Sequence, residues 1–139
     1  MSNKLSGEFS WQIRIYYEDT DAACVVFYAN YLRYMERART EWLRELGFEH
    51  DYLIKQHGIL FAVKSLAIDY KKPGHLDDLL TVTSHLLQQK GASLIFQQTI
   101  KREYELLTSA EIRVACLNAS TLKAAAIPKE LLTELANDS

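Results

Sequence analysis

The sequence is poor in the residues that mark secreted, metal-binding and membrane proteins. Only two of its 139 residues are cysteines, and the spacing of Cys24 and Cys116 fits neither a disulfide framework nor a metal site. The four histidines also lack ligand spacing, so we expect no metal. Residues 1–7 lack the apolar core of a signal peptide, and the longest apolar run, residues 22–29, is too short to span a bilayer. These absences predict a protein of the reducing cytoplasm without a membrane span.

An excess of charge of one sign is missing as well. The chain has 16 Lys and Arg against 18 Asp and Glu, which gives a net charge of −2. A general nucleic-acid binder normally carries a basic surface, so we expect no nucleic-acid partner. The hydrophobic share of 48% and the charged share of 24% are typical of a globular protein, and residues 1–139 are expected to form one domain.

The most informative stretch is residues 16–46, where an acidic turn and a short apolar run precede a helical pattern. Gly47 supplies a stop for this helix. The apolar residues recur at steps of four, three, four and four and form one stripe on a helix: Tyr31, Met35, Ala38, Trp42 and Leu46. The charged residues are expected mostly on the opposite side: Arg33, Glu36, Arg37, Arg39, Glu41, Arg44 and Glu45.

Apolar alternation predicts five strands. The first covers residues 9–17 and ends in Tyr17, whereas residues 59–70 are apolar on both faces and read as a strand that is covered on both sides for part of its length. Three further alternating strands, with short antiparallel connections, are predicted at residues 80–86, 94–100 and 110–116, with turns at 71–74 and 90–91. Pro128 opens a last helix over residues 129–136.

This order of elements predicts an α+β fold in which an antiparallel sheet of about five strands curls around one long central helix. One helix cannot cover both faces of such a sheet. We therefore expect the chain to associate with copies of itself.

Two aspartates, Asp19 and Asp21, stand at the link between the first strand and the helix. Asp21 precedes the helix entry at Tyr28 by seven residues. The free backbone N–H groups at a helix start can bind an anion or a developing oxyanion, and this spacing places a carboxylate near them. The alternative is a plain turn, in which either aspartate only bonds backbone. The residues alone leave both interpretations open.

The chain resembles the hotdog-fold acyl-CoA thioesterases of the 4-hydroxybenzoyl-CoA thioesterase family, and is most similar to the branch associated with the bacterial Tol–Pal system. The resemblance covers nearly the whole chain. It is carried by Tyr17-Glu18-Asp19-Thr20-Asp21, Val25-Val26, Asn30-Tyr31, Glu36-Arg37-Ala38-Arg39-Thr40-Glu41, Tyr70-Lys71-Lys72-Pro73 and Leu76-Asp77-Asp78-Leu79-Leu80. It implies a hotdog fold and hydrolysis of an acyl-CoA.

The resemblance assigns roles to several of these residues. Asp21 corresponds to the catalytic carboxylate, as nucleophile or as general base, and the backbone N–H at Tyr28 corresponds to the donor that polarises the thioester carbonyl. Asp19 is expected to structure the turn. Tyr17 is a candidate for a hydrogen bond near the site, although an alternating strand aromatic is more often a core residue.

Two positions depart from the family pattern. Tyr28 stands where the Tol–Pal branch usually has histidine. A hydratase would require a histidine beside the acid, so the tyrosine disfavours that activity. Cys24 stands where the family usually has glycine, and its side chain would narrow the acyl pocket or require another backbone conformation. A buried small hydrophobe is the favoured interpretation of Cys24, with a nucleophilic thiol as the weaker one.

Binding of the substrate's coenzyme A is assigned to lysines in turns, with Lys90 foremost and Lys71 and Lys72 as further candidates for its phosphates. No separate cofactor is expected. The expected partners are a second copy in a dimer or tetramer, with acyl carrier protein as a further candidate. The alternative function is a non-catalytic module that binds acyl-CoA or acyl carrier protein in envelope maintenance.

Overall fold

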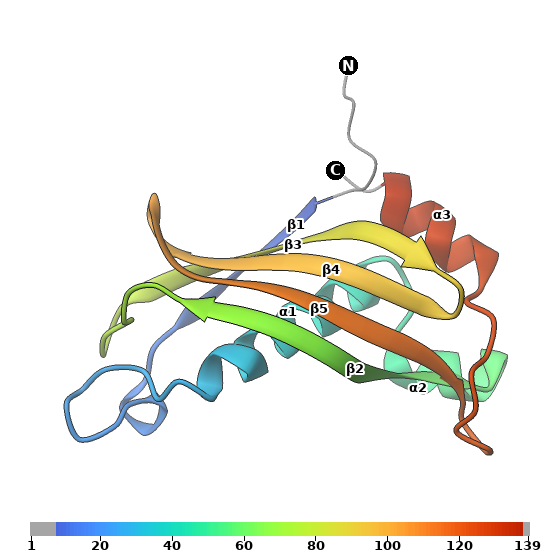
Figure 1. The fold of residues 1–139 in the computed structure, drawn as a ribbon, viewed down its shortest axis with the longest axis horizontal. Coiled ribbons are helices and arrows are strands. Elements are labelled where there is room, and N and C mark those ends of the chain that lie inside the picture. Colours follow the sequence, from blue (N-terminus) through green and yellow to red (C-terminus); the bar gives the residue numbers. More distant parts are fainter. Residues whose placement is uncertain (1–7, 138–139) are drawn as a thin grey trace.

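The computed structural model describes residues 8–137. A five-stranded antiparallel sheet of order β1-β3-β4-β5-β2 carries the long helix α1 on one face (Figure 1). The strands are β1 (Glu8–Arg14), β2 (Ile59–Tyr70), β3 (Leu79–Lys90), β4 (Ser93–Arg102) and β5 (Glu105–Asn118). The helices are α1 (Asn30–Glu45), α2 (His50–Tyr52) and α3 (Lys129–Asn137), with shorter helical turns at Tyr17–Asp19 and Leu53–His57. This architecture confirms the predicted hotdog fold.

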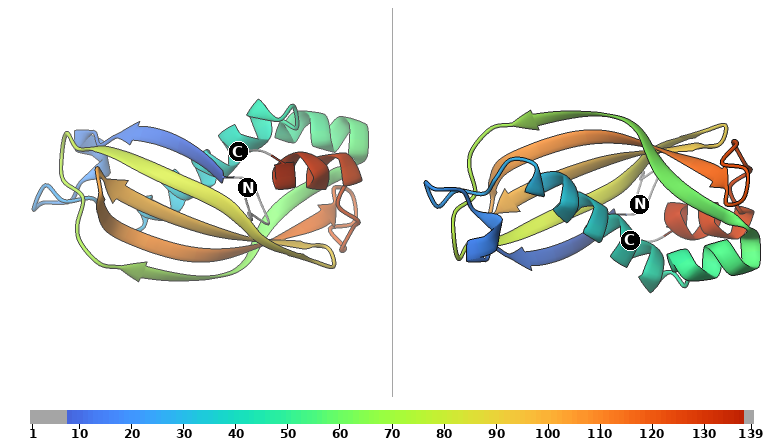
Figure 2. Two further views of the ribbon diagram at one scale, coloured as in Figure 1. Left: turned by 90° about the horizontal axis from the view of Figure 1, so that it is seen from above. Right: turned by 90° about the horizontal axis from the view of Figure 1, so that it is seen from below.

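Helix α1 forms where the apolar stripe predicts it. Met35, Ala38 and Trp42 are fully buried against the sheet, and the Trp42 ring stacks on Phe9 with ring centroids 6.0 Å apart. The helix ends before Gly47, whose φ of +90° is a left-handed conformation that glycine adopts without steric cost. Seen from below in Figure 2, α1 crosses one face of the sheet; in the described chain the other face carries no helix. The expectation that one helix leaves a face open therefore holds for residues 8–137.

Arg39 is an exception among the charged residues of α1, which the spacing places mostly on the side opposite the apolar stripe. It follows Met35 by four residues, and the helical repeat therefore places it beside the buried stripe. Its Nη1 donates to Oε1 of Gln98 at 2.8 Å, and Gln98 in turn donates to Ser84 Oγ at 2.7 Å. Burial lowers the pKa of Arg39 to about 10. A polar cluster thus lies within the interface between helix and sheet.

The first strand is shorter than predicted, because it ends at Arg14. Residues 17–19 form a single helical turn, in which the Tyr16 N–H donates to Asp19 Oδ2 at 2.8 Å. The Tyr16 N–H thus bonds to a nearby carboxylate and not to a backbone carbonyl of β3. Tyr17 is consequently not a core residue: its side chain is 75% exposed.

Strand β2 also departs from the prediction. It is an edge strand that pairs only with β5, and its middle, residues 62–67, is exposed on both faces. Val63 and Leu66 are 48% and 40% exposed. The connection to β3 is no hairpin, since residues 71–78 lead from this edge to the opposite side of the sheet, beside β1. The cover expected over β2 is not supplied by residues 8–137.

The remaining strands confirm the predicted alternation and extend beyond the predicted limits. Leu80, Val82, Ser84 and Leu86 of β3 are buried, and the residues between them are only half-buried. Val82, Ile100 and Thr108 occupy matching positions on β3, β4 and β5, and all three are fully buried. The buried face of the sheet is therefore mainly apolar and includes the polar residues Ser84, Gln98 and Thr108.

Candidate active site

Asp19 holds the link between β1 and α1 together. Besides the bond from Tyr16 to its carboxylate, its carbonyl oxygen accepts the Phe27 N–H at 3.0 Å and the Asn30 Nδ2 at 2.9 Å. Asn30 is buried at the first position of α1. One residue thus connects the turn to the start of the helix, which is the structural role expected for Asp19.

Asp21 is fixed through its backbone and leaves part of its carboxylate free. Its N–H donates to the Val25 carbonyl at 2.9 Å, and its carbonyl accepts the Cys24 N–H at 3.0 Å. Oδ1 accepts the Ala23 N–H at 2.9 Å, whereas Oδ2 accepts no hydrogen bond from any described residue. The side chain is exposed. The aspartate therefore forms the local turn and still offers one oxygen to a ligand.

Cys24 adopts a left-handed backbone conformation, which fits a position where the resemblance implies glycine. Its φ is +63°, in the left-handed region where a side chain is strained. The residue is exposed, so the favoured interpretation of a buried small hydrophobe is wrong for Cys24. Cys116, by contrast, is buried, and burial raises the pKa of its thiol to about 11.

Tyr28 lies two residues before α1 and carries the predicted donor. Among the residues that the structure describes, its backbone N–H meets no acceptor, while its carbonyl accepts the Tyr31 N–H at 3.3 Å. Its ring is 63% exposed and contacts Phe27 and Tyr70, with centroids 5.0 and 6.0 Å away. A free N–H at a helix start can bind a carbonyl oxygen or an anion. Tyr28 and Asp21 thus offer a donor and a carboxylate from one segment.

Tyr17 lies on the turn that precedes Asp21, and its carbonyl accepts the Thr20 hydroxyl at 2.7 Å. Its phenol makes no hydrogen bond within residues 8–137.

The three predicted lysines lie in different surroundings. Lys71 pairs with Asp69 at 3.2 Å, and Lys72 pairs with Glu105 at 2.9 Å. Lys90 ends β3, at the opposite end of the sheet from the loop of Asp21 (Figure 1). There it lines a hollow of about 510 Å³ together with Lys64 and Arg113. The structure therefore does not bring Lys90 and Asp21 of one chain together.

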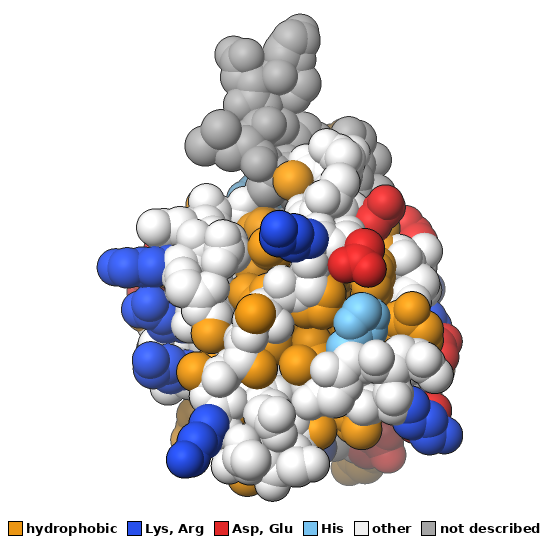
Figure 3. Space-filling model, turned by 90° about the vertical axis from the view of Figure 1, so that its right-hand side faces the viewer, with side chains coloured by type: hydrophobic (Ala, Val, Ile, Leu, Met, Phe, Trp, Pro, Cys, Tyr) orange, Lys and Arg blue, Asp and Glu red, His pale blue; other side chains and the backbone are white. Residues whose placement is uncertain are grey.

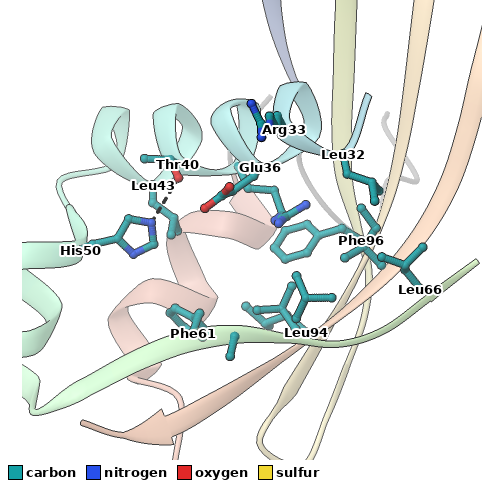
Figure 4. Close-up of a pocket in the computed structure, with 15 residues that line it drawn as sticks. Leu32, Arg33, Glu36, Thr40, Leu43, His50, Phe61, Leu66, Leu94 and Phe96 are labelled. Atoms are coloured by element: carbon teal, nitrogen blue, oxygen red, sulfur yellow. Dashed lines mark hydrogen bonds between the residues drawn. The ribbon is translucent and has the colours of Figure 1, made fainter. Parts of the chain in front are cut away.

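A cavity of about 450 Å³ lies between α1 and β2. Its walls are mainly apolar, with contributions from Leu43, Phe61, Leu94 and Phe96. Figure 4 shows Glu36 reaching from α1 toward the cavity and His50 at its side, bonded to Thr40 at 3.1 Å. The volume suits a small-molecule site, for which 300–1,000 Å³ is common. None of the six predicted site residues lines this cavity.

The comparisons with known proteins identify the family. A family model described as the thioesterase-like superfamily matches residues 16–135. The acyl-CoA thioesterase YbgC of Haemophilus influenzae is 45% identical over 127 residues, covering 91% of this chain and 93% of that protein. The chain belongs to the thioesterase-like superfamily. The predicted family is thereby confirmed, and the protein is an enzyme of the thioesterase class.

Other superfamily members agree with this assignment. The long-chain acyl-CoA thioesterase FadM of Escherichia coli is 36% identical over 109 residues, covering 77% of this chain and 81% of FadM. The crystal structure of a probable thioesterase from Bartonella henselae has a TM-score of 0.84 and 31% identity, covering 88% of this chain and 100% of that one. Sequence and fold thus point to the same family.

Two residues of this thioesterase that border the cavity were overlooked as site candidates, Arg39 and His50. The signal for Arg39 was its place four residues after Met35, on the buried stripe. His50 carried no signal, because its contact to Thr40 depends on how the chain folds back after α1.

Within residues 8–137, no cluster of His, Cys, Asp and Glu could hold a metal ion, and no helix is long and apolar enough to cross a membrane.

Proposed function

We propose that this thioesterase hydrolyses an acyl-CoA to the free acid and coenzyme A. The observation that carries the proposal is the pairing of two free groups in one segment. Asp21 keeps one carboxylate oxygen unbonded, and the Tyr28 N–H has no acceptor in the described chain. The names of the relatives YbgC and FadM, both acyl-CoA thioesterases, support the choice of substrate class.

The chemistry follows from these two groups. The Tyr28 N–H donates to the thioester carbonyl oxygen and stabilises the negative charge that develops there. Asp21 attacks the carbonyl carbon, which expels the thiolate of coenzyme A and leaves a mixed anhydride for water to hydrolyse, or it takes a proton from a water that attacks directly. Both routes consume one water and release the acid and coenzyme A. The geometry supports Asp21 in either role.

Tyr17 and the cavity are assigned to substrate placement. The Tyr17 phenol is exposed and free on the turn before Asp21, so it can donate a hydrogen bond to a bound thioester. The apolar cavity between α1 and β2 begins one turn of helix beyond Tyr28, at Leu32 and Arg33. We assign this cavity to the acyl group of the substrate, because its walls are mainly apolar.

We infer an assembly of at least two copies, as a dimer or a tetramer, and the position of Lys90 supports it. Strand β3 has 12 residues, and at roughly 3.3 Å per residue it keeps Lys90 about 36 Å from the end that holds Asp21. Antiparallel pairing of two β2 edges around a two-fold axis would bring the Lys90 end of one sheet beside the Asp21 end of the other. The exposed edge, with apolar residues such as Val63 and Leu66, favours this pairing.

The coenzyme A phosphates are assigned to the hollow of Lys90. Lys64 and Arg113 line the same hollow, so three cations converge on one surface. Figure 3 shows this end of the molecule, where Lys and Arg side chains gather along one side of a hydrophobic patch. Lys71 and Lys72 are secondary candidates, since each would have to exchange an acidic partner for a phosphate.

The test is Asp21→Asn, with Asp19→Asn as its matched control. Release of coenzyme A from a series of acyl-CoAs should show turnover about 100-fold lower or worse for Asp21→Asn, because the amide is neither a nucleophile nor a base. Asp19→Asn should keep most of the turnover and lose about 1 kcal/mol of unfolding free energy, because it weakens the cap on the Tyr16 N–H.

Near wild-type turnover by a folded Asp21→Asn protein would disprove the catalytic assignment. If the wild type binds coenzyme A thioesters and hydrolyses none of them, the protein is a binding module instead.

A further inference from the structure

Residues 71–78, which connect β2 to β3, form backbone hydrogen bonds with the segment of residues 21–28 that contains Asp21. The Val26 N–H donates to the Gly74 carbonyl at 2.8 Å, and the Leu76 N–H donates to the Cys24 carbonyl at 3.1 Å. Val25 and His75 form the bridge between these two bonds. Since the Asp21 N–H donates to the Val25 carbonyl, Asp21 is one hydrogen bond away from this bridge.

The same connection also grips the start of α1. The Gly74 N–H donates to the Tyr31 hydroxyl at 2.9 Å. A Cβ on Gly74 would lie 3.2 Å from Val26 Cγ2 and 3.3 Å from Leu80 Cδ1, so the glycine permits a close approach. Residues 71–78 therefore set the carboxylate segment and the helix start relative to one another.

Arg102, at the end of β4, holds this connection in place. Its Nη1 donates to Asp78 Oδ2 at 2.7 Å and contacts His75 Nδ1 at 3.2 Å. Its Nη2 donates to Glu105 Oε1 at 2.7 Å, and Glu105 also pairs with Lys72. The side chains of Arg102 and Asp78 are only 27% and 19% exposed. A rigid guanidinium fork thus connects the β4–β5 hairpin to both ends of residues 71–78.

Asp78 completes the connection. Its Oδ2 accepts the His75 N–H at 2.8 Å as well as the Arg102 guanidinium. Burial alone would raise the pKa of Asp78, but these two hydrogen bonds and the nearby positive charge outweigh it and lower the pKa. The carboxylate therefore stays charged and keeps the fork engaged.

We propose that Arg102 is a positioning residue for the hydrolysis, which sets Asp21 against the Tyr28 N–H through Asp78, His75 and Val25. The inference rests on the proposed function, because it requires Asp21 to act on the thioester. Rates of positioned reactions are steep in distance, and a shift of about 1 Å can cost about 100-fold. Loosening residues 71–78 should therefore reduce turnover without unfolding the protein.

The test compares Arg102→Met with Arg44→Met. Arg44 is the matched control, because it also contacts two carboxylates, Glu41 at 3.3 Å and Glu49 at 2.9 Å, but lies at the far end of α1. Coenzyme A release should show kcat lower by about 10- to 100-fold for Arg102→Met, with KM within about twofold of wild type. Arg44→Met should keep wild-type kcat, and the two variants should melt at similar temperatures. Arg102→Lys should recover part of kcat, because it keeps the charge and one bond to Asp78.

A second arm places Arg102→Met in the Asp21→Asn background. A residue that acts through Asp21 has nothing left to position there, so the residual rate should equal that of Asp21→Asn alone. A further drop of similar size in that background would overturn the inference. So would equal kcat values for Arg102→Met and Arg44→Met while Asp21→Asn is inactive, and this result would leave the proposed function intact. A wild type that hydrolyses no thioester would overturn both.

Discussion

The two ends of the sheet differ in what they have available for a substrate. At the end with Asp21, hydrogen bonds that involve Asp19, residues 71–78 and Arg102 hold the connecting segments in place. One carboxylate oxygen of Asp21 and the Tyr28 N–H meet no hydrogen-bond partner among residues 8–137. At the other end, Lys64, Lys90 and Arg113 line a common hollow. We propose that the first end carries out the chemistry on the thioester carbonyl and that the second binds the phosphates of coenzyme A. Under this proposal a complete site needs the two ends from two different chains, because about 36 Å of β3 separates them within one chain.

The largest effect should come from breaking the proposed contact between the β2 edges of two chains. Leu66→Glu places a charge on the exposed β2 edge, where it would be buried and unpaired if two edges meet. Sedimentation should then show a 16.0 kDa monomer, and this measurement decides whether the β2 edges meet. The value of kcat/KM should fall by about 100-fold, because neither end retains its partner and because Leu66 also lines the cavity assigned to the acyl group.

The matched control for the β2 edge is Leu122→Glu. Leu122 is 60% exposed but lies in a loop outside the strands, so this variant should keep the wild-type assembly and activity. A Leu66→Glu protein that sediments and hydrolyses like wild type would show that the two ends work within one chain or meet by another surface.

A smaller effect should follow from weakening only the cationic end. Lys90→Ala should raise the KM for acyl-CoA about tenfold and leave kcat nearly unchanged, because a lost charge-assisted hydrogen bond to a phosphate weakens binding and not the chemical step. The salt dependence of KM should weaken as well. Lys129→Ala, at the start of α3, serves as the control, since it lies outside the hollow. An unchanged KM in Lys90→Ala would remove Lys90 from the site.

The fold could be predicted where the pattern of the chain is local. The stripe of α1 and the alternation of β3, β4 and β5 report which side of each element is buried, and both agree with the structure. The place of β2 could not be predicted in this way. A strand that is apolar on both faces indicates cover, but its pattern does not say whether the same chain or another copy supplies it.

In the candidate site, too, features set by the local sequence could be predicted and features that depend on distant segments could not. The Asp21 carboxylate, with one oxygen that has no partner in residues 8–137, and the Tyr28 N–H lie in the segment that the motif marked, because eight consecutive residues form this segment. Tyr17 does not continue the first strand as the alternation predicts, because β1 ends at Arg14 and the Tyr16 N–H donates to the Asp19 carboxylate instead. The pairing of Lys72 with Glu105 depends on the β4–β5 hairpin, which no local pattern reports.

The smallest expected effect concerns Cys24, which lies at the end of the sheet that holds Asp21. A left-handed conformation costs a residue with a side chain roughly 1–2 kcal/mol, while glycine loses more chain entropy on folding. The balance predicts that Cys24→Gly raises the free energy of unfolding by about 0.5 kcal/mol, measured by denaturant titration. Cys24→Ala keeps the Cβ and should gain nothing from relief of strain.

Both Cys24 variants should hydrolyse acyl-CoA at close to the wild-type turnover, because the proposed chemistry uses Asp21 and the thiol takes no part in it. Loss of turnover in both would instead assign the nucleophile to Cys24. Loss in Cys24→Gly alone would show that the strained backbone itself, and not the thiol, holds Asp21 in place, since the alanine variant keeps a side chain at the same φ.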